Sequence, residues 1–228
     1  MSPDLQRRFA VLVAAAVPLI ELFWGPESPL RRLIIAVVGN HEYRGPWILF
    51  QHACVYTLPA AALSVILWFV LARRGLLPPL RDSLRLTPSR AIVLWGVGVG
   101  LAVAGLNIAI FAVLAWRGLL EGFSLEYVPP NGWDIAGNVV SNFYEELIAR
   151  GFLIVTMRMV FRSAPIAVAI SSLCFGFGHT QYPMFERCFI AVAGAMQCVA
   201  YLRTRSLWAP YISHEVYDLI LDCAVKVG

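Results

Sequence analysis

Charged residues are scarce in this chain, at 14% of 228 positions, whereas hydrophobic residues make up 59%. Soluble domains carry about 25% charged residues, so this composition, with a mean hydropathy of +0.71, argues against an ordinary soluble enzyme. The basic residues are arginines except for Lys226, and no basic run alternates with aromatic residues on a polar segment. A nucleic-acid partner is therefore not expected.

Cysteines at disulfide or metal-binding spacing are also lacking, because the sequence contains no C-x-x-C pair. The cysteines are odd in number, scattered, and located inside or beside apolar blocks. We therefore predict buried free thiols rather than a disulfide or metal framework. They are Cys54, Cys174, Cys188, Cys198 and Cys223.

Long uncharged apolar blocks are what the sequence does contain, and each is suited to a hydrocarbon core of roughly 30 Å. Backbone groups in lipid must bond within their own segment, so these blocks are predicted to be helices. We expect an all-α fold: a polytopic membrane helix bundle of about seven transmembrane helices with a polar intramembrane cavity. The predicted spans are 8–24, 47–71, 91–116, 134–161, 164–182, 184–202 and 207–226.

The segments between the spans also carry predictions. The apolar core of residues 33–38 is too short to cross a membrane and suits a surface or re-entrant piece, and residues 80–86 suit an interfacial stretch. Gly96, Gly100 and Gly105 in the third span predict close helix packing. The first span is predicted to be uncleaved, because Pro18 and Glu21 interrupt a signal-peptide pattern.

The distribution of basic residues predicts the orientation. With the N-terminus inside, eleven Lys and Arg residues lie on the inner side and six on the outer side. This bias favours a cytoplasmic N-terminus and an outward C-terminus. The same topology places His179 near the outer end of its span and His214 nearer the inner end of its own, which conflicts with a shared site.

Two adjacent acids and a base interrupt the fourth span, where each costs about 2.5–3.5 kcal/mol by insertion scales. Glu146 and Arg150 are four residues apart and share a helical face, so they are expected to pair. Glu145 is rotated by about 100° from Glu146 and is left free for chemistry. Ser141, four residues before Glu145, is expected to hydrogen-bond to it.

Two later spans contribute histidines. Phe175 precedes His179 by one turn at the end of the fifth span, beside two glycines that allow a close approach of another backbone. His214 and Asp218 share one face of the seventh span, with Asp222 a further turn along. Where these groups converge with Glu145, a carboxylate and a histidine can activate water, and the second histidine can donate to an oxyanion.

The three patterns E-E-x-x-x-R at 145–150, F-x-x-x-H at 175–179 and H-x-x-x-D at 214–218 occur in this order on three apolar segments. Together they resemble the signature of the CAAX prenyl protease / bacteriocin-processing (CPBP, Abi) family of intramembrane glutamic endopeptidases. The resemblance covers residues 134–222, which implies a catalytic core there and accessory N-terminal spans in 1–133, within one membrane domain, 1–228.

The resemblance implies a role for each motif residue. Glu145 would be the general base that activates water with His179, and His214 with Asp218 would form the oxyanion site. The last position is often Asn in the family, whereas Asp218 donates a hydrogen bond only when protonated or through water. The supporting residues would be Glu146, Arg150 and Phe175.

The resemblance also implies the surroundings of the reaction. The enzyme would need no metal or other cofactor and would hydrolyse a peptide bond in a membrane-associated protein or peptide. It would be a multi-pass protein of a prokaryotic plasma membrane. Prenylated tails, peptide leaders and bacteriocin-like precursors are all possible substrates, and nothing in residues 1–133 selects among them or indicates an oligomeric state.

Other functions use the same residues. A zinc-dependent membrane hydrolase would bind its metal through Glu145, His179 and His214. A proton-coupled transporter would use the buried acids, although the inverted repeats of such carriers are not evident. A non-catalytic partner-binding protein would use Glu145, Glu146 and Arg150 only as an ion-pair lock between helices.

Overall fold

The computed structural model describes residues 2–23, 29–38, 46–47, 58–85, 87–119, 124–180 and 182–226. These residues form helices apart from two paired two-residue strands, which confirms the all-α prediction. His41, His52 and Cys54 lie outside the described residues. The helices are α1 (Pro3–Phe23), α2 (Pro29–Val38), α4 (Leu58–Arg73), α5 (Leu80–Leu84), α6 (Arg90–Trp116), α7 (Gly132–Glu146), α8 (Ile154–Phe161), α9 (Ala164–Gly178), α10 (Met184–Thr204) and α11 (Trp208–Ala224).

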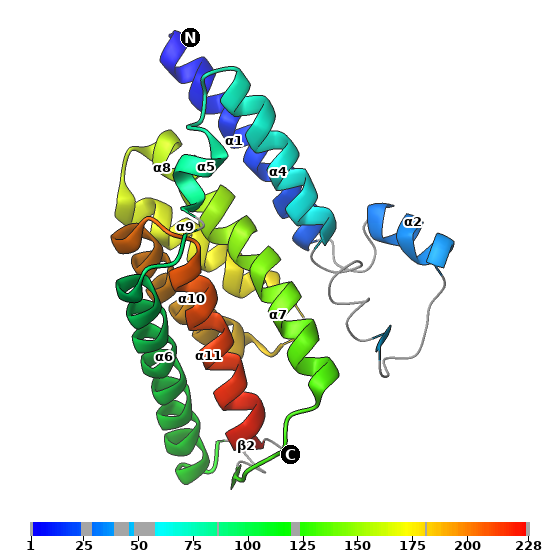
Figure 1. Cartoon of the computed structure of the whole chain (residues 1–228), viewed down its shortest axis with the longest axis vertical. Coiled ribbons are helices and arrows are strands. Elements are labelled where there is room, and N and C mark those ends of the chain that lie inside the picture. The colour runs from blue at the N-terminus through cyan, green and yellow to red at the C-terminus, as the bar shows by residue number, and fades with distance from the viewer. Residues whose placement is uncertain are drawn as a thin grey trace.

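The helices α6, α10 and α11 lie side by side, and α7 runs along the other side of α11 (Figure 1). The contact of α6 with α11 depends on glycine. A Cβ added at Gly96 would lie 2.7 Å from Ile212 Cβ, and one at Gly100 would lie 2.7 Å from the Ser213 carbonyl oxygen. Close packing is therefore confirmed at these two positions. It is wrong at Gly105, where an added Cβ would meet nothing within 4 Å because this residue faces outward.

The predicted fourth span is one continuous helical run with a change of geometry in its middle. The α7 helix leads directly into a π-helical segment, η3 (Leu147–Leu153), which leads into α8. The run begins with the Asn131 side chain accepting from the backbone amide of Trp133 at 3.0 Å. It ends where Arg162 adopts a left-handed conformation, with φ of 52°. The acidic pair lies at the junction of α7 and η3.

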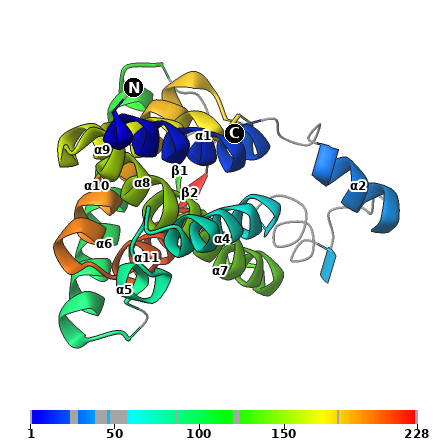
Figure 2. The same ribbon diagram turned by 90° about the horizontal axis from the view of Figure 1, so that it is seen from above.

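A second helical layer packs on η3, α8 and α9. Its core joins α1, α4 and the fourth-span run through Val11, Trp68, Phe152 and Ile154, all buried. The Trp68 indole also donates to the carbonyl of Pro78 at 2.8 Å, which satisfies its one polar atom. Seen from above, α1 and α4 lie on one side of the bundle, and α2 lies apart from it (Figure 2). This layer holds the rear of the segment that carries the acids.

Two of the described helices, α6 and α10, are long and apolar enough to cross a membrane, and α4 and α9 are shorter apolar helices. The 10 residues of α2 agree with the prediction that this segment is too short to span. Residues 80–84 form the short helix α5 within the predicted interfacial stretch. Among the cysteines, Cys198 is a buried free thiol as predicted, whereas Cys188 is free but exposed because it lies on the outer face of α10.

Candidate active site

Glu146 and Arg150 form a fully buried ion pair at the junction of α7 and η3. Arg150 Nη1 donates to Glu146 Oε1 at 2.9 Å, and both side chains are 0% exposed. Its Nη2 donates to the Gly194 carbonyl at 3.3 Å and to the amide oxygen of Gln197, both on α10. The predicted pair is therefore present, and it ties the acidic segment to α10.

Arg150 also stacks on Phe175, which brings α9 to the same place. Its guanidinium carbon lies 4.1 Å from the centre of the Phe175 ring, a cation–π contact that desolvation strengthens. Gly194 makes room for this stack, because an added Cβ there would lie 3.1 Å from both Arg150 Nη2 and the Phe175 ring. Neither Gly194 nor Gln197 was predicted, since a glycine and a glutamine on an apolar helix carry no chemical signal of their own.

Glu145 faces His179, the residue that follows α9. The distance from Glu145 Oε2 to His179 Nε2 is 3.7 Å, and the two side chains are 21% and 19% exposed. His179 Nδ1 lies 2.8 Å from the carbonyl oxygen of Phe175. Because a carbonyl only accepts, Nδ1 carries the proton, and in the neutral ring Nε2 is left as an acceptor facing Glu145. The backbone of α9 thus selects the tautomer.

His214 lies between two carboxylates. Its Nδ1 is 2.9 Å from Glu146 Oε1, and its Nε2 is 3.6 Å from Asp218 Oδ2. The Phe175 ring contacts both histidines, with centroid distances of 4.8 Å to His179 and 5.8 Å to His214. All the predicted site residues therefore come together around Phe175.

The conflict in the predicted depths of the two histidines also has a physical explanation. The α9 helix has 15 residues, or about 22 Å at 1.5 Å per residue, which is shorter than a hydrocarbon core of about 30 Å. The end of α9, and His179 with it, therefore need not reach the outer face of the bundle. His214 is the seventh residue of α11, well inside that helix.

Asn142 is a site residue that the sequence reasoning missed. Its side-chain amide donates to Asp218 Oδ2 at 2.7 Å, and the residue is 3% exposed. The signal was its position, one turn before Glu146 in an apolar segment. Ser141 was expected to bond to Glu145, but its hydroxyl donates to the Asn138 carbonyl at 3.4 Å, one helical turn back.

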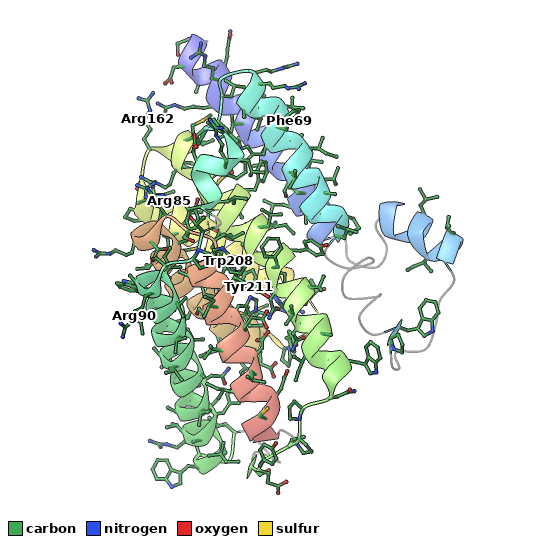
Figure 3. All side chains as sticks on the ribbon, viewed as in Figure 1. Phe69, Arg85, Arg90, Arg162, Trp208 and Tyr211 are labelled. Carbon is green, nitrogen blue, oxygen red and sulfur yellow. The ribbon has the colours of Figure 1, made fainter. Side chains whose placement is uncertain are left out.

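An aromatic cluster packs beside the acids, where α7 meets α11. The Phe143 and Tyr211 rings meet edge to face at 5.7 Å, and Tyr211 meets Trp208 at the same distance. Figure 3 shows Trp208 and Tyr211 on α11 near α7. The Tyr211 hydroxyl donates to the Val139 carbonyl at 3.1 Å. These contacts fix the seam between the two helices that carry Glu146 and His214.

Within the described part of the chain, no three His, Cys, Asp or Glu side chains are arranged to hold a metal ion. The His214 donor set explains this locally, because its Nδ1 is taken by Glu146 Oε1. The arrangement that is present consists of an acid facing a histidine, a second histidine between acids, and a buried arginine that balances charge. Such a set can take a proton from water and place a hydrogen-bond donor near a carbonyl.

Comparison with known proteins agrees with this geometry. Residues 130–220 match the family model described as type II CAAX prenyl endopeptidase Rce1-like. No curated protein and no solved structure matches the chain. The family implies a protease with a peptide or protein substrate, and with the apolar helices it indicates an integral membrane protein. The resemblance read from the three motifs is thereby confirmed, and residues 130–220 belong to the Rce1-like family of CAAX prenyl endopeptidases.

Proposed function

We propose that the protein is a glutamic endopeptidase that works without a metal and hydrolyses a peptide bond of a membrane-associated protein or peptide. The observation that supports this most directly is the pair of Glu145 Oε2 and His179 Nε2, 3.7 Å apart. That distance is too long for a direct hydrogen bond and suits a water that contacts both atoms. Glu145 and His179 are the catalytic residues that act on this water.

The first step is proton transfer from water. The Glu145 carboxylate takes one proton, while His179 Nε2 accepts a hydrogen bond from the other O–H and aims the oxygen. The Phe175 carbonyl supports this role because it holds the proton of the ring on Nδ1. The hydroxide then adds to the carbonyl carbon of the substrate, and the electron pair of the C=O bond moves to its oxygen.

The second step is stabilisation of that oxyanion. His214 donates from Nε2, while its Nδ1–H is bonded to Glu146 Oε1 at 2.9 Å. A ring that donates from both nitrogens is an imidazolium, and the nearby carboxylates of Glu146 and Asp218 balance its charge. Arg150 in turn balances Glu146, so the support is continuous. Preorganised donors of this kind contribute several kcal/mol in a site that excludes water.

The third step is collapse of the tetrahedral intermediate. The C–N bond breaks, the leaving nitrogen takes the proton held by Glu145, and the products are a carboxylic acid and an amine. Glu145 returns to the carboxylate form, so one water is consumed in each cycle.

The proposal extends to the setting of the enzyme. Seven spans cross a prokaryotic plasma membrane, the N-terminus is cytoplasmic, and the substrate reaches the site while it is associated with the bilayer. The arginine bias of the loops supports this orientation. Reporter fusions after residues 74, 117 and 204 test it, because the first and third are expected inside and the second outside.

The decisive experiment for the activity compares Glu145→Gln with the wild type. The change keeps the shape and removes the base, so a loss of roughly 10²- to 10⁴-fold in rate is expected. Asp134→Asn is the matched control, because Asp134 is an exposed acid on the same helix. Peptidomes of cells that express each form report the substrate, and a fluorogenic peptide with a farnesylated CAAX end reports the rate. Full processing by Glu145→Gln would overturn the proposal.

A further inference from the structure

Three polar pairs join α7 to α11 in one register. Asn138 donates to Asp222 at 3.0 Å, Asn142 donates to Asp218 at 2.7 Å, and Glu146 accepts from His214 at 2.9 Å. Both sets of residues are spaced by four, so the antiparallel helices present one pair per turn. The exposure of the pairs falls along the series, from the partly exposed Asn138–Asp222 pair to the buried Glu146–His214 pair.

The middle pair is the one next to the site. An ionised carboxylate has no proton to donate, so the amide must present its NH₂ group to Asp218. A hydrogen bond of 2.7 Å from a buried amide to a carboxylate is short and charge-assisted. Asp218 is therefore held toward α7 by Asn142, which is 3% exposed.

This hold sets the distance between Asp218 and His214. Asp218 Oδ2 lies 3.6 Å from His214 Nε2, beyond a hydrogen bond but close enough for attraction between charges. Without the Asn142 bond, Asp218 would be free to turn about its side-chain torsions and accept the Nε2–H directly. His214 would then have both N–H groups occupied, one by Glu146 and one by Asp218.

We propose that Asn142 is a positioning residue that holds Asp218 off His214 Nε2, so that this N–H stays free for the oxyanion while the Asp218 charge stays near. The inference rests on the proposed function of the site. It also gives Asp218 a defined task at a position where the family often has an asparagine: the amide is supplied by the neighbouring helix, and the acid is its acceptor.

The test is a double-mutant cycle in the full chain with the fluorogenic farnesylated peptide. Asn142→Leu keeps the volume and removes the donor, and it should lower kcat by roughly 10- to 100-fold with little change in KM, the cost of misplacing one catalytic group. In the Asp218→Asn background the same change should have almost no effect on kcat, because no carboxylate is left to occupy His214. Equal effects in both backgrounds would overturn the proposal, since they would indicate a structural role only.

The matched control is the neighbouring pair of the same geometry. Asn138→Leu removes the 3.0 Å bond to Asp222 one turn farther from the site, and kcat should change by less than about twofold, as for surface substitutions. Asn142→Ser, which shortens the donor, replaces Asn142→Leu where the larger side chain prevents folding. A loss with Asn138→Leu as large as with Asn142→Leu would contradict the assignment.

A spectroscopic readout separates this inference from the proposed function. In protein labelled with ¹⁵N-histidine, the Nε2–H proton of His214 should move downfield in Asn142→Leu, because Asp218 then accepts from it. The signal should stay in place in Asn138→Leu. An unchanged His214 signal in Asn142→Leu refutes the inference, whether or not the peptide is cleaved. Failure of the wild type to cleave any peptide would instead refute the proposed activity.

Discussion

Gly176→Ala should destabilise the protein and slow the reaction, because Gly176 lies where α9 crosses α10. A Cβ added there would lie 2.6 Å from both Cβ and the backbone nitrogen of Ala191, and it would also overlap the Arg187 carbonyl. The obstructing atoms belong to the backbone of α10 or to a Cβ, so no side-chain rotation relieves the overlap. The helices must move apart by several tenths of an ångström, three residues before His179.

The size of the effect follows from two opposing contributions. Overpacking of a well-packed contact costs about 1–3 kcal/mol, and alanine is favoured over glycine in a helix interior by about 1 kcal/mol. The net cost at Gly176 is therefore as much as about 2 kcal/mol. For a chain of this size, that lowers the Tm by roughly 4–8 °C.

Thermal unfolding in detergent micelles measures this shift, and the fluorogenic peptide assay measures the rate. Gly105→Ala is the control, because it is also a helical glycine but an added Cβ meets nothing within 4 Å. That variant should melt at or slightly above the wild type and keep its activity. If both variants melt alike, the close crossing of α9 and α10 at Gly176 is wrong.

Four further changes test other contacts. Arg150→Met should cost about 3–5 kcal/mol in unfolding free energy, because it leaves the buried Glu146 carboxylate without its partner, and denaturant titration measures it. Ser171→Ala should cost about 1 kcal/mol in the same titration, since its hydroxyl donates to the Ala149 carbonyl of η3 at 2.8 Å. Trp68→Phe removes the 2.8 Å bond to the Pro78 carbonyl and should cost about 1–3 kcal/mol, again by titration. Treatment with 1,10-phenanthroline should leave the cleavage rate unchanged, whereas a zinc hydrolase would lose its activity.

The helical fold and its main segments could be predicted from the sequence, because apolar blocks separated by Arg, Pro and Gly mark helix ends strongly. The bounds of α6 agree with the predicted span of 91–116 to within one residue. The glycines Gly96 and Gly100 were correctly predicted at a helix contact, but the sequence alone could not show that Gly105 faces outward. Which face of an apolar helix contacts protein is decided by its neighbours, and composition does not distinguish protein from lipid there.

The candidate site was predictable only in part. Charges inside apolar segments pointed to Glu145, Glu146 and Arg150, because a buried charge is costly without a partner. Asn142 and Gln197 were missed because an uncharged amide in a helix is ordinary until its partner is known. The matching spacing of 138, 142 and 146 against 214, 218 and 222 was present in the sequence, yet it gains meaning only once α7 is known to lie antiparallel to α11.

The π-helical segment has a consequence for comparing this protein with its relatives. The backbone amide of Ile154 donates to the Ala149 carbonyl, five residues back, so the helix is one residue wider there than an α-helix. That extra residue shifts the angular phase of everything after it by about 100°, which is why Arg150 points to α10 although 138, 142 and 146 face α11. A single-residue gap between positions 147 and 153 in an alignment would therefore rotate α8 against α7, and should be treated as a change of architecture rather than as alignment noise.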